Sequence, residues 1–176
     1  MNQTQKRIRN KALSFLDEQE TKGNSGFKSP RFEELMLKTR WQKGQSWCAY
    51  FAELVWEQSG QDIELFSGST VKTFENFHAK SRTRVGANIG DVVIWQTYKD
   101  GYPRWTGHAG IVVAVQGNQI VTVEGNTNSS GGREGIEVAM KIRSTNTKPD
   151  NGLRIMGFII PEEPNKGIVA KPTLTA

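Results

Sequence analysis

The 176-residue sequence contains a single cysteine, Cys48, and only two histidines, His78 and His108. One cysteine excludes an internal disulfide and any multi-cysteine zinc site, so its sulfur is either a small core group or a reactive thiol. No run of about 18 uncharged apolar residues occurs, which predicts that there is no integral membrane segment. The basic N-terminus is not followed by the apolar stretch of a secretory signal, so we expect synthesis in the cytoplasm without a signal peptide.

What is present is ordinary globular composition, with 36% hydrophobic and 23% charged residues, which predicts one compact unit with its own core. A net charge of +5 and a pI near 9.4 favour an anionic partner, which could be nucleic acid, a lipid surface or an acidic wall polymer. The Lys and Arg residues form no periodic stripe and no recognised motif, so we do not expect nucleic acid to be the partner.

Amphipathic segments with capping residues predict four helices in the first half of the chain. They cover residues 5–20, 30–39, 47–58 and 71–79. In the third of these, Glu53 and Glu57 are placed on the polar face. Short β-branched runs follow without helices between them, and they predict strands at 92–95, 111–115, 120–123, 136–140 and 155–160.

Two loops divide these strands. Gly117 and Asn118 predict a hairpin turn, and residues 125–135 predict a polar, glycine-rich loop. Consecutive strands joined in this way form an antiparallel sheet or half-barrel. The predicted fold class is therefore α+β, with N-terminal helices packed on a C-terminal antiparallel sheet.

Cys48 falls in the first turn of the third predicted helix. The partial positive charge of a helix N-terminus stabilises a thiolate there, which makes this position suitable for a nucleophile. The alternative is an inert core residue beside Trp47 and Phe51. A thiolate needs a base that exchanges a proton near neutral pH, and the two histidines are the candidates.

His108 is the better candidate for the base, because its small neighbours at the head of a strand are expected to leave the ring open to a groove. His78 is expected to be a solvated surface residue. Glu124 and Asn126 end the next strand, and strands about 4.8 Å apart bring such side chains within reach of the ring. Gln45 or the backbone N–H of Cys48 is a candidate oxyanion donor, whereas Asp91 is expected to be a turn residue.

Four short motifs occur in a specific order: Trp47 to Phe51, Gly90-Asp91, Gly107 to Val112, and Glu124 to Thr127. From about Gly23 to Pro161 the chain resembles the CHAP family of cysteine amidohydrolases and peptidases, within the broader NlpC/P60 papain-like group. The resemblance implies a catalytic domain at 23–161. The helical pattern before it predicts an N-terminal helix in 1–22, and the few large apolar residues after it predict a loose tail at 162–176.

The resemblance also implies residue roles: Cys48 as nucleophile, His108 as general base and then acid, Glu124 as the group that orients His108, and Asn126 as a further polar member. Peptidoglycan is the implied substrate. Some family members carry an aspartate-rich calcium loop ahead of the nucleophile, but residues 38–43 offer no carboxylate, so we expect no metal and no other cofactor.

The resemblance leaves the bond open between a cell-wall endopeptidase and an amidase. We expect a monomeric phage lysin or injected effector that acts on the wall after release or injection. Such an enzyme works with a holin or a secretion system, or is controlled by an inhibitor protein. The alternative is a non-catalytic wall-docking component of a virion or secretion machine.

Overall fold

The computed structural model describes residues 1–127 and 135–163, in which helices come first and strands follow. The helices are α1 (Gln3–Leu13), α2 (Pro30–Lys38), α3 (Cys48–Glu57) and α4 (Thr70–Ala79). The strands are β1 (Thr83–Arg84), β2 (Val92–Lys99), β3 (Tyr102–Gln116), β4 (Gln119–Thr127), β5 (Glu137–Ser144) and β6 (Gly152–Ile159). The α+β fold class predicted from the sequence is confirmed.

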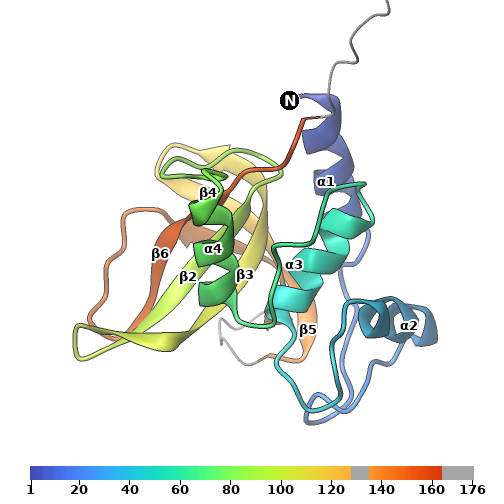
Figure 1. The fold of residues 1–176 in the computed structure, drawn as a ribbon. Helices are drawn as coiled ribbons and strands as arrows, with labels where there is room; N and C mark the ends of the chain where they lie inside the picture. The colour runs from blue at the N-terminus through green and yellow to red at the C-terminus, as the bar shows by residue number, and fades with distance from the viewer. Residues whose placement is uncertain (128–134, 164–176) are drawn as a thin grey trace, which may run out of the picture.

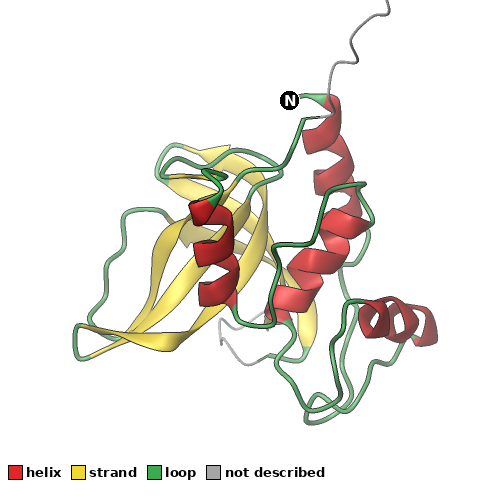
Figure 2. Cartoon of the chain, viewed as in Figure 1, coloured by secondary structure: helices red, strands yellow, loops and turns green. Residues whose placement is uncertain are grey.

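The strands form one antiparallel sheet in the order β1-β6-β2-β3-β4-β5. The sheet curls into a half-barrel, and Figures 1 and 2 show α4 and α3 lying against it while α2 lies away from it. The sheet therefore has a convex face that the helices cover and a concave face on its inside.

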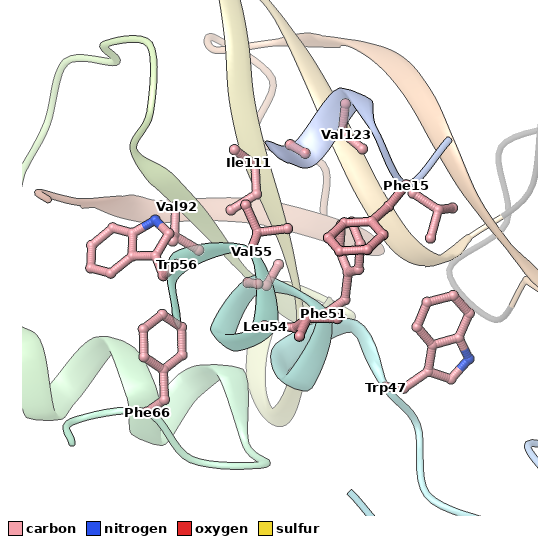
Figure 3. Close-up of a cluster of buried hydrophobic side chains, with 14 of the residues drawn as sticks. Phe15, Trp47, Phe51, Leu54, Val55, Trp56, Phe66, Val92, Ile111 and Val123 are labelled. Carbon is pink, nitrogen blue, oxygen red and sulfur yellow. The ribbon is translucent and has the colours of Figure 1, made fainter. Parts of the chain in front are cut away.

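The main core lies between the helices and the convex face of the sheet. Trp56, Leu54 and Val55 of α3 meet Val92 of β2 and Ile111 of β3 there, and all five side chains are buried (Figure 3). A smaller apolar cluster fills the concave face, formed by Val93, Trp95, Val112, Ile120 and Phe158. Burying both faces of the central strands fixes their register, because a shift by one residue would exchange the two sets of side chains.

The helix limits follow local capping signals where such signals exist. Ser29 and Ser69 accept hydrogen bonds from the first turns of α2 and α4, as their sequences predict. The predicted helix at 5–20 is wrong at its C-terminal end, because α1 stops at Leu13. Beyond it the Asp17 and Glu20 N–H groups donate to carbonyls of 138 and 136, so pairing with β5 replaces further helical bonds.

The strands are longer than the sequence predicted. Asp100 and Gly101 both have positive φ (53° and 80°) and form a tight turn, so β3 begins at Tyr102 rather than at 111. The predicted loop at 125–135 starts too early, because β4 continues through Thr127; residues 128–134 lie outside the described part. The two-residue turn at Gly117 and Asn118 is confirmed by the pairing of Gln116 with Gln119.

Two further predictions concern Glu53 and the C-terminal tail. Glu53 is predicted on the polar face of its helix, but its side chain is buried, with Arg40 Nη2 at 3.2 Å from Oε1. Of the tail expected at 162–176, residues 164–176 lie outside the described part of the chain. Glu162 still makes contacts with the fold, since its N–H donates to Gln61 Oε1 at 2.7 Å.

Candidate active site

Cys48 is the first residue of α3, and its side chain is almost entirely buried. The preceding residue, Trp47, occupies the N-cap without making a side-chain cap hydrogen bond, so the N-terminal N–H groups of α3 are not covered by a side chain of that residue. The Trp47 indole instead donates to Glu20 Oε2 at 2.6 Å, and both side chains are buried. This bond fixes the end of the helix that carries the sulfur.

His108 lies within β3, on the concave side of the sheet where it pairs with Trp95. Its Nε2 is 2.9 Å from Glu124 Oε2, and neither side chain is exposed. The other ring nitrogen, Nδ1, is buried and has no nitrogen or oxygen partner in residues 1–127 or 135–163, and Cys48 is the other group that interacts with the ring. Since Nε2 is held by the carboxylate, Nδ1 is the atom available to exchange a proton with Cys48.

The charges around His108 change its protonation. Burial alone would lower the pKa of His108, but the thiolate of Cys48 and the Glu124 carboxylate outweigh it and raise the pKa to about 9. At neutral pH the ring is therefore protonated beside the Cys48 sulfur.

Glu124 is held from several sides. Burial would raise its pKa, but hydrogen bonds from Arg143 and His108 lower the pKa to about 2. Arg143 Nε lies 2.9 Å from Oε1 and Nη2 lies 2.6 Å from Oε2, while Thr122 Oγ1 lies 2.6 Å from Oε1. The carboxylate thus stays charged over the whole physiological range.

Glycines let these groups approach one another. A Cβ at position 110 would lie 2.8 Å from the Glu124 side chain, and one at position 107 would lie 2.2 Å from the Trp95 carbonyl. His108 borders the cleft, as expected from its small neighbours, although its side chain is fully buried. The glycines also allow close packing around it.

Asn126 follows Glu124 on the same strand and lines the same cleft as Cys48 and His108. Its backbone has a positive φ of 55°, and the β4–β5 register shifts between Glu124 and Thr127. Such an irregularity turns a side chain out of the regular alternation of a strand. All four residues predicted as the site therefore lie together.

Gly125 separates Glu124 from Asn126 where β4 meets α3. A Cβ there would lie 2.6 Å from Trp47 Cζ3 and 2.7 Å from Phe51 Cβ, both in the buried core. We expect Gly125→Ala to push α3 from the sheet and to destabilise the fold by about 1–3 kcal/mol. Urea unfolding measures this effect.

Gly117→Ala is the control. It lies at a turn where a Cβ meets nothing within 4 Å, although its positive φ carries a small strain of its own. Equal midpoints for the two variants would contradict the packing argument.

The cleft has a volume of about 570 Å³. Its lining comes from the residues before and within α3, from the start of α4 and from β3 and β4: Gln45, Ser46, Cys48, Tyr50, Ser67, Gly68, Ser69, Thr70, Trp105, Thr106, Gly107, His108 and Asn126. Trp105 is 81% exposed and borders the cleft where β3 carries extra residues opposite Gln96 to Tyr98.

The other candidates lie as follows. The Gln45 side-chain oxygen accepts from Gln42 N and Tyr50 OH, so its amide nitrogen is the donor it can offer to the cleft. His78 is exposed, with Nδ1 2.9 Å from Thr83 Oγ1, as the sequence predicted. Asp91 is buried and pairs with Arg84. Burial raises the pKa of Asp91, and this effect is larger than the lowering by Arg84. Asp91 therefore joins β1 to β2 and does not border the cleft.

Sequence reasoning missed Arg143 and Thr122. Both lie on the concave face, and only the pairing of Ile120 with Arg143 brings the guanidinium to Glu124. No short motif marks Arg143, because its place depends on the register between β4 and β5. The alternation of side chains between the two faces of the sheet, along the last residues of β5, is the one signal that could have indicated a side chain facing Glu124.

Within the described ranges, no three His, Cys, Asp or Glu side chains come close enough together to hold a metal ion. Among the helices of the same ranges, none has the length and apolar character that crossing a membrane requires.

A cysteine at a helix N-terminus, a strand-borne histidine and an antiparallel half-barrel define the papain-like class of α+β folds. Residues 40–126 match the family model of the CHAP domain, and this part of the chain belongs to that family. The matched range contains Cys48, His108, Glu124 and Asn126. CHAP domains are typically hydrolases that act on peptidoglycan. Neither a curated protein nor a solved structure matches the chain significantly.

Proposed function

We propose that this protein is a cysteine hydrolase that cleaves amide bonds in bacterial peptidoglycan, with Cys48 as nucleophile and His108 as its base and acid. One observation carries the proposal: His108 bridges Glu124 and the cleft that contains Cys48, within the span that matches the CHAP family. The charge of +5 suits the anionic polymers of a cell wall.

In the first half of the reaction, the Cys48 thiolate attacks the carbonyl carbon of the amide and the C=O electrons move to oxygen. The backbone N–H of Cys48 and the Gln45 amide stabilise this oxyanion. The proton on His108 Nδ1 then passes to the leaving nitrogen as the C–N bond breaks. The products are a free amine and an acyl group bound to the sulfur.

In the second half, His108 Nδ1 takes a proton from water while the water oxygen attacks the thioester carbon. The C–S bond then breaks and releases a carboxylic acid, which leaves the thiolate and the imidazolium as before. Glu124 accepts a hydrogen bond from Nε2 throughout, which keeps Nδ1 directed at the reacting atoms. Asn126 supplies a polar wall to the cleft.

The test is digestion of purified sacculi, followed by mass spectrometry of the released fragments. Whole stem peptides with a new N-terminal amine would mean an amidase, and shortened or uncrosslinked peptides would mean an endopeptidase. Protein alkylated beforehand on Cys48, the single cysteine, is the blank. Binding to sacculi without any release would contradict the proposal and favour a wall-docking component.

The pKa of His108 predicts the alkaline limit of hydrolysis. Because the leaving nitrogen needs the imidazolium proton, the rate should fall about tenfold per pH unit above about 9. Alkylation of Cys48 by iodoacetamide needs only the thiolate and should not fall there. Parallel rate profiles between pH 5 and 10 measure both, and a decline of both together would contradict the assignment of His108 as the acid.

A further inference from the structure

Arg143 lies behind the candidate site, near the end of β5, which pairs with the strand β4 that carries Glu124. Its guanidinium uses two nitrogens, one to each oxygen of Glu124, at 2.9 and 2.6 Å. The carbon between them lies 5.5 Å from the centre of the Trp95 ring, and that ring lies 5.8 Å from the His108 ring. Arg143 thus contacts both groups that surround the histidine.

The carboxylate has no freedom in this arrangement. Oε2 is shared by His108 and Arg143, and Oε1 by Thr122 and Arg143. A two-nitrogen contact of this kind fixes the plane of a carboxylate, which a lysine ammonium does not do. The lone pair that accepts from His108 is therefore set by the position of Arg143.

We propose that Arg143 is a positioning residue of the active site, which holds the Glu124 carboxylate against Nε2 of His108. The proposal deepens the proposed function and rests on the roles given there to Cys48 and His108. It adds that the acid limit of the reactive thiolate depends on a residue that touches neither the cysteine nor the histidine.

The physical reason is the burial of Glu124. Burial favours the neutral carboxyl, and the Arg143 hydrogen bonds are the first of the contacts that oppose it. Without them the carboxyl should take up a proton at a higher pH. The imidazolium then loses its buried counter-charge, and the proton returns from His108 to Cys48.

The test is the rate of Cys48 alkylation by iodoacetamide between pH 4 and 8, for the full chain and two variants. The quantity compared is the rate at a pH on the acid limb of the profile, where the wild-type rate falls tenfold per pH unit, divided by the rate at pH 8, in which changes in access to the thiol cancel. We expect Arg143→Ala to lower this ratio about tenfold, as a shift of one pH unit would. Arg143→Lys keeps the charge without the paired contact and should lower it about threefold.

Arg154 provides the matched control. Its side chain is as exposed as that of Arg143, at 22%, and it also pairs with a carboxylate and lies over an aromatic ring, Tyr98. Arg154→Ala should leave the ratio unchanged. If Arg143→Ala fails to fold by circular dichroism, Arg143→Lys decides. A wild-type ratio in the folded Arg143 variants, or an equal loss in Arg154→Ala, overturns the proposal.

The alkylation readout needs no peptidoglycan, so it separates the two hypotheses. A lowered ratio in Arg143→Ala, together with no cleavage of sacculi by the wild type, would retain the role of Arg143 and reject the substrate. Cleavage of sacculi by the wild type, together with an unchanged ratio in Arg143→Ala, would retain the substrate and reject the role of Arg143.

Discussion

Cys48→Ala is expected to reduce the release of peptidoglycan fragments by roughly 10⁴-fold or more, because no other thiol can form the acyl intermediate. The sulfur lies at the N-terminus of α3 beside a protonated histidine, and alanine replaces the whole nucleophile. The measurement is fragment release from sacculi over time. Binding to sacculi should persist, since the cleft keeps its remaining walls.

The two histidines supply a control for the same experiment. His108→Ala should lose activity to a similar degree, whereas His78→Ala should retain it, because His78 is exposed and bonded to Thr83. Circular dichroism separates loss of chemistry from loss of fold. Undiminished release by Cys48→Ala, or equal effects of the two histidine variants, would remove the proposed mechanism.

The parts of the fold that the sequence predicted well are those with local signals. Ser29 and Ser69 each accept a hydrogen bond from a backbone N–H three residues later. A few neighbouring residues therefore determine where α2 and α4 begin. The end of α1 is different. It depends on hydrogen bonds from Asp17 and Glu20 to the carbonyls of residues 138 and 136, in and just before β5 and more than a hundred residues away, which no local pattern predicts.

The site shows the same division. Cys48 and His108 stand in short motifs on single elements, and the hairpin at Gly117 and Asn118 joins the His108 strand to that of Glu124. Arg143 depends on the register of two strands whose connection gives no such signal. Asp100-Gly101 was a readable hairpin signal that explains why β3 starts early and His108 lies within it rather than at its head.

Glu124→Gln should lower the rate of peptidoglycan cleavage by about 10²–10⁴-fold, as removing the group that orients a catalytic histidine does elsewhere. The amide also turns a donor towards the guanidinium of Arg143, which then lacks its counter-charge. Breaking a buried ion pair lowers the free energy of unfolding, and the Arg143 side chain is 22% exposed. We therefore expect Glu124→Gln to lower the free energy of unfolding by about 3 kcal/mol, near the lower end of the range for such pairs. Cleavage rates and urea unfolding at pH 7 measure the two effects.

The pH dependence of stability provides the sharper test of Glu124. Its pKa falls from the ordinary 4.5 to about 2 on folding, so its ionised form stabilises the native state above pH 4.5, and that contribution declines as the pH falls towards 2. The stability gap between wild type and Glu124→Gln should therefore narrow on acidification.

Glu53→Gln is the matched control for Glu124→Gln, since Glu53 is equally buried and pairs with Arg40, but burial raises its pKa. Folding disfavours the ionised form of Glu53. The difference in stability between wild type and Glu53→Gln should therefore not narrow on acidification, as it should for Glu124→Gln. Activity at pH 7 should also be retained, because Glu53 does not border the cleft. Full activity in Glu124→Gln, with a stability gap constant from pH 7 to 3, would mean that Glu124 neither orients His108 nor carries the buried charge.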